Sequence, residues 1–179
     1  MWLPQLLHAI NQNQMIDLGL QLTIDDLYSI NNSSVKDAVV SLSWGSCTGE
    51  MISDQGLMLT NHHCAYDDIQ NHSSVKNDYL ENGFWAMSNT EELPNKNLTA
   101  SFLISIEDVT EQIISELSDD MSEKERADKI AALSKQIVKK KITDSHYDAR
   151  VKSFFGGNSF YLLVYETFED VRLVGAPPS

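Results

Sequence analysis

The chain has 179 residues, of which 42% are hydrophobic, so it is long and apolar enough to bury the core of one ordinary domain. It contains 26 acidic and 13 basic residues, and its formal net charge is −13. This negative charge excludes a nucleic-acid backbone or an anionic membrane as partner. No apolar run approaches the roughly 20 residues that a membrane-spanning helix needs.

Both ends of the sequence look like parts of a folded protein. The first seven residues, from Met1 to Leu7, have no basic start and no small-residue cleavage site, so they do not predict a signal peptide. At the other end, residues 174–179 follow a strand-like run directly, without a tail. We therefore expect the chain to be a piece of a longer protein.

The first third of the chain predicts helices followed by a β-meander. Residues 1–38 have helical spacing and loops, with Thr23 as the N-cap of a short second helix. Residues 38–44, 50–53 and 57–60 are rich in β-forming residues. Gly56 lies in the short connection between the last two runs and can adopt the positive φ that a hairpin loop requires. We expect three successive antiparallel strands.

The rest of the chain predicts a helical insertion between further strands. Residues 62–98 show no regular pattern, and residues 100–106 predict a strand. Residues 108–143 predict helices, because Ser122 and Glu125 form a capping-box pattern before an apolar stripe. Strands are expected again within residues 147–175, around a turn at 156–158. The fold class is mainly β, and Trp44, Phe84 and Trp85 are expected to pack in the core or between domains.

The two cysteines, Cys47 and Cys64, flank the expected hairpin and lie 17 positions apart. A disulfide between them would close a loop of that size and stabilise the fold by about 3 kcal/mol. A paired cysteine count fits an oxidising compartment, but two buried reduced thiols account for the same sequence. The spacing leaves both states open.

The densest group of chemically active side chains follows the strand at 57–60, and three interpretations compete for it. In the first, the two histidines only bond loop carbonyls. In the second they bind a metal, although no spacing matches a usual zinc motif and adjacent residues of an extended chain point in opposite directions. The available donors would be His62, His63, Cys64, Asp67, Asp68 and His72.

The third interpretation is the general base of a serine peptidase. In chymotrypsin-type barrels a cysteine begins a hairpin whose second strand ends in His-Cys, and the imidazole at the barrel rim takes a proton from a serine hydroxyl. The stretch from Cys47 to Cys64 has this layout. A neutral imidazole with a pKa near 6.5 suits that role at neutral pH.

The stretch 47–64 resembles the N-terminal signature of the bacterial dipeptidyl-peptidase 7 and 11 family of serine peptidases. Flanking segments are similar to the same family, so the resemblance runs along the whole chain and is weakest in the helical stretch 110–146. These segments are residues 1–6, 28–34, 77–80, 83–87, 92–95 and 172–179.

The resemblance implies a metal-independent exopeptidase that removes dipeptides from the free N-terminus of oligopeptides. It implies a periplasmic, secreted or cell-surface enzyme, typically a homodimer, with a chymotrypsin-like double β-barrel and a large inserted helical domain. This chain would be the first barrel, with N-terminal helices and a helical insertion at about 108–143. His63 would be the catalytic histidine, His62 a structural one, and Cys47 and Cys64 the bridge that fixes this corner.

The same resemblance places the aspartate and the serine of the catalytic triad beyond Ser179, so we expect the chain alone to be inactive. Asp108 lies 45 positions after His63 and would be the choice of aspartate without the family, but we interpret it as a helix-start residue. Ser46 and Ser53 lack a nucleophile motif. The alternative is a non-catalytic secreted β-domain whose histidine cluster is structural or binds a metal.

Overall fold

The computed structural model describes residue 6 and residues 12–178. The chain divides into two compact units. One, the helical unit, comprises the N-terminal part up to Asp37 together with Leu103–Glu166; the other, the cysteine unit, comprises Ala38–Phe102 and Thr167–Ser179. Strands β6 (Ala100–Asp108) and β8 (Ser159–Phe168) each begin in one unit and end in the other.

The cysteine unit is built on an antiparallel meander, which confirms the three strands expected from the sequence. Its strands are β1 (Val39–Leu42), β2 (Cys47–Met51) and β3 (Met58–Thr60), and β1 also pairs with the start of β6. Gly56 has a φ of +87° in the β2–β3 turn, where the Ser53 hydroxyl accepts the backbone N–H groups of Gln55 and Leu57. The order β3-β2-β1-β6 buries Val40 and Leu42.

The expectation that residues 62–98 are irregular was wrong for their first part. Helix α4 (His62–His72) begins two residues after β3, and Ile69 on it is 1% exposed against Leu173 and Ala176. Two short ladders pair these residues with the C-terminal part of the unit. They are β4 (Phe84–Trp85) with β10 (Gly175–Ala176), and β5 (Leu93–Pro94) with β9 (Arg172–Leu173); α5 (Tyr79–Asn82) precedes β4.

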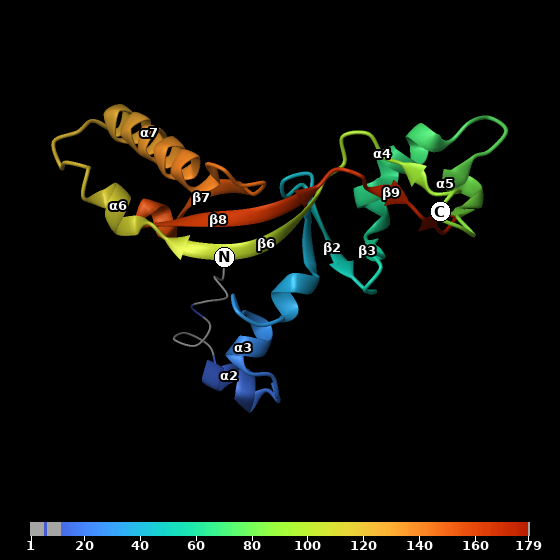
Figure 1. Cartoon of the computed structure of the whole chain (residues 1–179), viewed down its shortest axis with the longest axis horizontal. Coiled ribbons are helices and arrows are strands. Elements are labelled where there is room, and N and C mark those ends of the chain that lie inside the picture. Colours follow the sequence, from blue (N-terminus) through green and yellow to red (C-terminus); the bar gives the residue numbers. More distant parts are fainter. Residues whose placement is uncertain (1–5, 7–11, 179) are drawn as a thin grey trace. The chain divides into compact units, whose positions relative to one another are not determined.

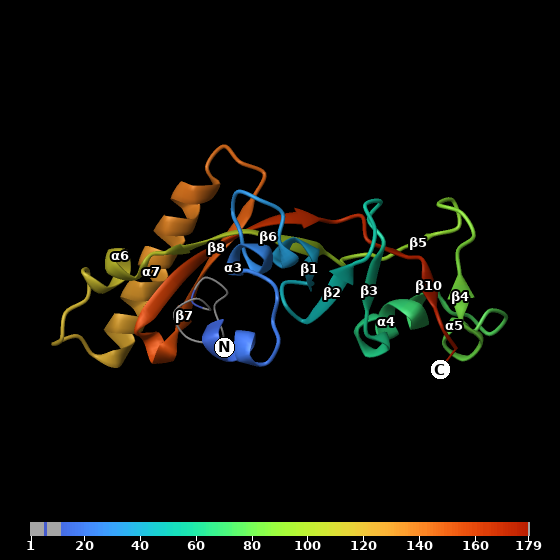
Figure 2. The ribbon, with the colours of Figure 1, turned by 90° about the horizontal axis from the view of Figure 1, so that it is seen from below.

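The helical unit packs helices against a hairpin made by β7 (Asp148–Phe154) and β8. Alternate side chains of β8 enter two different clusters, so both faces of this strand are buried. One cluster contains Tyr161, Leu163 and Tyr165; the other contains Phe160, Leu162 and Val164 and packs against α6 (Thr110–Ile114) and α7 (Glu123–Ile142). Helix α7 lies beside this hairpin in Figures 1 and 2.

Two helix starts of the helical unit confirm the sequence analysis. Thr23 caps α3 (Ile24–Leu27), and Ser122 caps α7 in a capping box with Glu125. The expected apolar stripe of α7 is present, and the structure packs it against the cluster on β8. Asp108 ends β6, and its carboxylate accepts the backbone N–H of Thr110 at 2.8 Å, so this residue does serve a helix start. The remaining helical pieces are α2 (Gln12–Asp17), η2 (Val35–Ala38) and η3 (Phe155–Gly157).

The fold is mainly β with some helices, and neither unit contains a closed barrel among its described residues. Trp44 and Trp85 do not lie in the core, since they are 43% and 66% exposed, so packing between domains stays a prediction for both; Phe84 is partly buried against Tyr79. Within residues 6 and 12–178, no helix has both the length and the apolar character to cross a membrane.

Candidate active site

The two histidines of the sequence cluster lie on the first turn of α4 and not at the end of a strand. Asn61 is the N-cap, and the backbone N–H of Cys64 donates to its carbonyl oxygen at 2.9 Å. Because successive helical residues are rotated by about 100°, His62 and His63 do not point in opposite directions as they would on an extended chain. Cys64 follows His63 directly and completes this turn.

The side chains of the two histidines have different surroundings. His63 is exposed to solvent, whereas His62 is partly buried and packs edge-on against Tyr66, with 6.1 Å between the ring centroids. The Nε2 atom of His62 is shielded from solvent and has no hydrogen-bond partner within the described part of the chain. Of the two rings, that of His63 is therefore the more open to an incoming molecule.

A disulfide joins the start of α4 to the start of β2. Cys47 and Cys64 are bonded in the structure, with Cα atoms 6.0 Å apart, and a ring nitrogen of His63 lies within 4.8 Å of both sulfur atoms. In this state the sulfur atoms are not free to bind a metal, since thiolates are the ligand form of cysteine. The bond ties the His63 segment to the meander.

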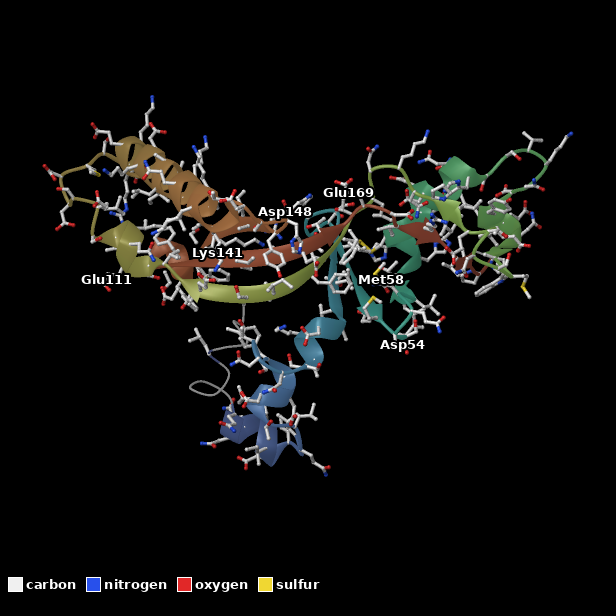
Figure 3. All side chains as sticks on the ribbon, in the orientation of Figure 1. Asp54, Met58, Glu111, Lys141, Asp148 and Glu169 are labelled. Atoms are coloured by element: carbon white, nitrogen blue, oxygen red, sulfur yellow. A yellow bond between two sulfur atoms is a disulfide. The ribbon has the colours of Figure 1, made fainter. Side chains whose placement is uncertain are left out.

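Close backbone contacts reinforce the same corner. Gly49 of β2 pairs with Thr60 of β3, and a Cβ atom at Gly49 would lie 2.7 Å from Sδ of Met58 and 2.9 Å from the Leu59 carbonyl oxygen. The Thr60 hydroxyl donates to the Thr48 carbonyl oxygen at 2.7 Å. Figure 3 labels Met58 on this hairpin and Asp54 at its tip. The absence of a side chain at Gly49 thus permits the close β2–β3 approach.

The far end of α4 is anchored by a contact that the sequence did not reveal. Nε2 of His72 lies 2.9 Å from Oδ1 of Asn95, which is 8% exposed. No local pattern could have shown this contact, because the partners are 23 positions apart and meet only through folding. Nε2 of His72 therefore already has a partner, and this contact anchors the end of α4.

Three other residues considered in the sequence analysis are partly buried or take part in hydrogen bonds that hold turns. Burial raises the pKa of the Asp68 carboxyl, with His72 lowering it and Asp67 raising it to smaller extents. The Ser46 hydroxyl donates to the Leu42 carbonyl oxygen, and Ser53 holds the hairpin turn. Neither serine is placed against a histidine by any of these bonds.

The helical unit contains a groove of about 690 Å³ whose lining differs from the surroundings of His63. Its apolar floor includes Leu133, Ile137 and Leu162, and Lys141 at its rim bonds Glu107 at 2.5 Å. Lys141, near the end of α7, is labelled in Figure 3. The residues that line the groove include no histidine, cysteine or serine, so we do not treat it as a reaction site.

Comparison with known proteins gives a consistent family. The family model Peptidase S46 matches residues 1–179. The chain is 49% identical over its full length to the Asp/Glu-specific dipeptidyl-peptidase of Flavobacterium psychrophilum, covering 25% of that protein. It is 41% identical over 99% of its length to dipeptidyl-peptidase 7 of Capnocytophaga gingivalis, again covering 25%.

Solved structures agree. The structure of Porphyromonas endodontalis DPP11 in complex with the dipeptide Arg-Glu matches with a TM-score of 0.85 at 42% identity, over 100% of this chain and 27% of that one. The same protein in complex with substrate matches with a TM-score of 0.86 at 43% identity and the same coverage. The chain spans about a quarter of the length of the relatives it matches, and it belongs to the Peptidase S46 family.

Proposed function

We propose that this chain is the N-terminal part of the catalytic domain of a serine dipeptidyl-peptidase, which releases dipeptides from the free N-terminus of oligopeptides. The family match over residues 1–179 and the names of the relatives support this proposal. The observation that carries it is the exposed His63 on the first turn of α4, next to a cysteine that is bonded to the preceding hairpin.

His63 is the general base in this proposal. Its neutral imidazole removes the proton from a serine hydroxyl as that oxygen attacks the carbonyl carbon of the second substrate residue. The resulting imidazolium then donates this proton to the leaving amine, and the dipeptide remains as an acyl-enzyme. His63 next takes a proton from the water molecule that attacks the ester, and returns it to the serine oxygen as the acyl–oxygen bond breaks and the dipeptide leaves. An exposed ring on an anchored helix suits these four transfers.

The partners of His63 in the reaction are proposed to lie beyond this chain. The family resemblance locates the triad aspartate and serine after Ser179, and the coverage of about a quarter of each relative agrees with a partial catalytic domain. In this proposal the meander belongs to the first barrel of a chymotrypsin-like double barrel, and residues 108–143 form its helical insertion. The 179-residue chain alone has no peptidase activity.

The location and assembly of the enzyme are part of the same proposal. A disulfide is stable in an oxidising compartment, so the Cys47–Cys64 bond supports a periplasmic, secreted or cell-surface enzyme. The full-length protein is proposed to be a homodimer and to need no metal cofactor for peptide hydrolysis. Light scattering on the purified full-length protein measures the assembly directly.

The test is peptidase activity of the full-length parent and its His63→Ala variant on fluorogenic dipeptidyl substrates. We expect kcat/KM to fall on the order of 10⁴- to 10⁶-fold, as for other triad members. The matched control is His146→Ala, an exposed histidine of the helical unit that bonds Glu166, which should keep parental activity. Equal activity of the His63→Ala variant and the parent would overturn the assignment.

The substrates should include both an acidic and an apolar residue at the second position. Relatives named Asp/Glu-specific dipeptidyl-peptidase reach 49% identity to this chain, and relatives named dipeptidyl-peptidase 7 reach 43%. Because of this difference in sequence identity, we propose that the preferred substrates are oligopeptides with an acidic second residue. A higher kcat/KM for the apolar substrate would overturn that preference and leave the role of His63 unaffected.

A further inference from the structure

The second half of α7 is a basic surface on an acidic protein. Helix α7 carries seven of the 13 basic residues of the chain but only three of its 26 acidic residues. From Lys129 to Ile142 it has five lysines and no acidic residue. This part of the helix therefore attracts negatively charged groups, which the net charge of −13 would otherwise repel.

The groove of the helical unit lies along this half of the helix, and we call it the α7 groove. Its volume of about 690 Å³ falls within the range of roughly 300–1,000 Å³ that is typical of ligand sites. The apolar floor consists of Leu133 and Ile137 of α7 together with Val109 and Leu162, which belong to the buried cluster beneath them. A ligand in this groove would bury apolar side chains against that floor.

Two ion pairs between α7 and the opposite wall mark the ends of the α7 groove. Nζ of Lys129 lies 3.5 Å from a carboxylate oxygen of Glu116, and Lys141 bonds Glu107 at 2.5 Å. At a rise of about 1.5 Å per residue, the helix between these two lysines is about 18 Å long. An extended chain spans about 3.3–3.6 Å per residue, so a segment of about five residues fits between the pairs.

The exposure of these ion pairs leaves the lysines available to other anions. The four side chains are between 39% and 56% exposed. Exposed pairs of this kind contribute about 0–1 kcal/mol, so an incoming carboxylate can replace Glu107 or Glu116 at little cost. Lys140 also lines the groove and adds a third cation to its rim.

The polar lining favours a peptide over a fatty acid of similar length. Gln112 of α6 and Gln136 of α7 both line the α7 groove, and a side-chain amide can donate to and accept from a peptide backbone. The lysines are distributed along the rim and not gathered at one end. A fatty acid has a single carboxylate and no amide groups, so it would use only a small part of this lining.

We propose that the α7 groove binds an acidic peptide segment of about five residues in an extended conformation. Because alternate side chains of an extended peptide point to opposite sides, apolar residues contact the floor while the acidic residues between them reach the lysines of the rim. The amides of Gln112 and Gln136 bond the peptide backbone. Negative charge and apolar side chains together define the ligand, and neither is sufficient alone.

A consequence for substrates rests on the proposed function. The ligand of the α7 groove is then an acidic oligopeptide substrate, held by residues other than those that react. Loss of the groove raises KM for long acidic peptides, leaves their kcat unchanged and does not affect short substrates. The binding itself does not depend on peptidase activity.

The experiment measures the fluorescence anisotropy of a labelled, N-acetylated pentapeptide of alternating leucine and glutamate. Acetylation removes the free amine that the proposed peptidase requires, so the peptide is not hydrolysed. We expect saturable binding to the 179-residue chain and to the full-length parent. Peptides with lysine in place of glutamate, or glycine in place of leucine, should bind at least about tenfold more weakly, because each loses one class of contact. Equal binding of the three peptides would overturn the proposal, as would binding to the chain but not to the parent.

Variants locate the binding site on α7. Lys140→Glu should weaken binding of the acidic peptide at least about tenfold, because it reverses a charge at the rim, whereas the control Lys124→Glu, outside the lining of the groove, should not. Ala132→Phe should block the groove from its exposed rim without removing core atoms, and the control Ala131→Phe, on the exposed neighbour that does not line it, should leave binding unchanged.

Two results with these variants would contradict the site. One is unchanged affinity in both the Lys140 and the Ala132 variants. The other is a dimer of the parental chain that Lys140→Glu abolishes, which would show that a second copy occupies this face. Circular dichroism of each variant verifies that α7 is intact. No readout is enzymatic, so an inactive parent would refute the proposed function and leave the binding result standing.

Discussion

The helical unit and the cysteine unit are stabilised in different ways. In the helical unit, β8 has apolar side chains on both faces, and residues such as Phe160 and Ile113 are at most 1% exposed. In the cysteine unit, one small cluster holds Val40, Leu42 and Ala100, and a second holds Ile69, Leu173 and Ala176. A disulfide and close backbone contacts support these smaller clusters.

This difference coincides with the position of the exposed His63. The exposed His63 and the two cysteines belong to the cysteine unit, in which a covalent bond fixes the start of α4 while leaving the imidazole open. A deep apolar core around His63 would bury the ring and close it to solvent. The lesson is that crosslinking can position an exposed residue where packing would hide it.

The largest expected effect is the loss of a core aromatic side chain from the helical unit. Phe160→Ala should lower the free energy of unfolding by about 3–5 kcal/mol, because it removes a ring packed among Val109 and Ile113 and leaves a cavity. Hydrogen exchange should increase most in β7 and β8. The control Phe155→Ala, at a residue 54% exposed, should cost no more than about 0.5 kcal/mol. Equal costs would contradict the view that buried apolar side chains stabilise the helical unit.

The second effect concerns the crosslink. Replacing both Cys47 and Cys64 by serine should lower the free energy of unfolding by about 3 kcal/mol, since the unfolded chain regains the entropy of the open loop. Exchange should increase in β2, β3 and the first turn of α4 and remain unchanged in α7. A thiol count on unreduced protein should find no reactive thiol, and two reactive thiols would contradict the bond.

The third effect tests the close contact between β2 and β3. Gly49→Ala places a methyl group 2.7 Å from Sδ of Met58 and should destabilise the protein by about 1–3 kcal/mol. Adding Met58→Ala should recover only part of this loss, because the Leu59 carbonyl oxygen remains 2.9 Å away. A thermal melt of the single and double variants measures both effects. Complete recovery would show that the side chain alone sets the contact.

The smallest effect is at the start of α7 in the helical unit. Ser122→Ala should cost about 1 kcal/mol, because the N-cap hydroxyl no longer accepts the Glu125 backbone N–H. The Ser122 hydroxyl, and secondarily its backbone N–H, lowers the pKa of Glu125. This contribution is present above the ordinary pKa of a glutamate and is lost as pH falls through the lowered one. Melts at neutral and acidic pH should show the variant's deficit shrinking in acid.

The local signals in the sequence predicted the elements that depend on local chemistry. The capping pairs at Thr23 and Ser122 start helices, Gly56 turns the hairpin, and α7 carries the apolar stripe. The histidine and cysteine motif was also visible, because its residue types and spacing are features of the sequence itself. The capping groups and the turn residues interact across only a few positions, so these elements required no long-range folding information.

The tertiary structure decided what depends on residues far apart in the chain. It placed His62 and His63 on a helix, where Ile69 packs against Leu173 and Ala176 about a hundred positions later. It paired the two-residue strand Phe84–Trp85 with Gly175–Ala176, a ladder too short to be predicted locally. Sequence alone thus identified the chemical groups and their neighbours along the chain. Which of the two imidazole rings, His62 or His63, remains exposed was determined by burial and long-range pairing. Burial and pairing depend on contacts that exist only in the folded chain.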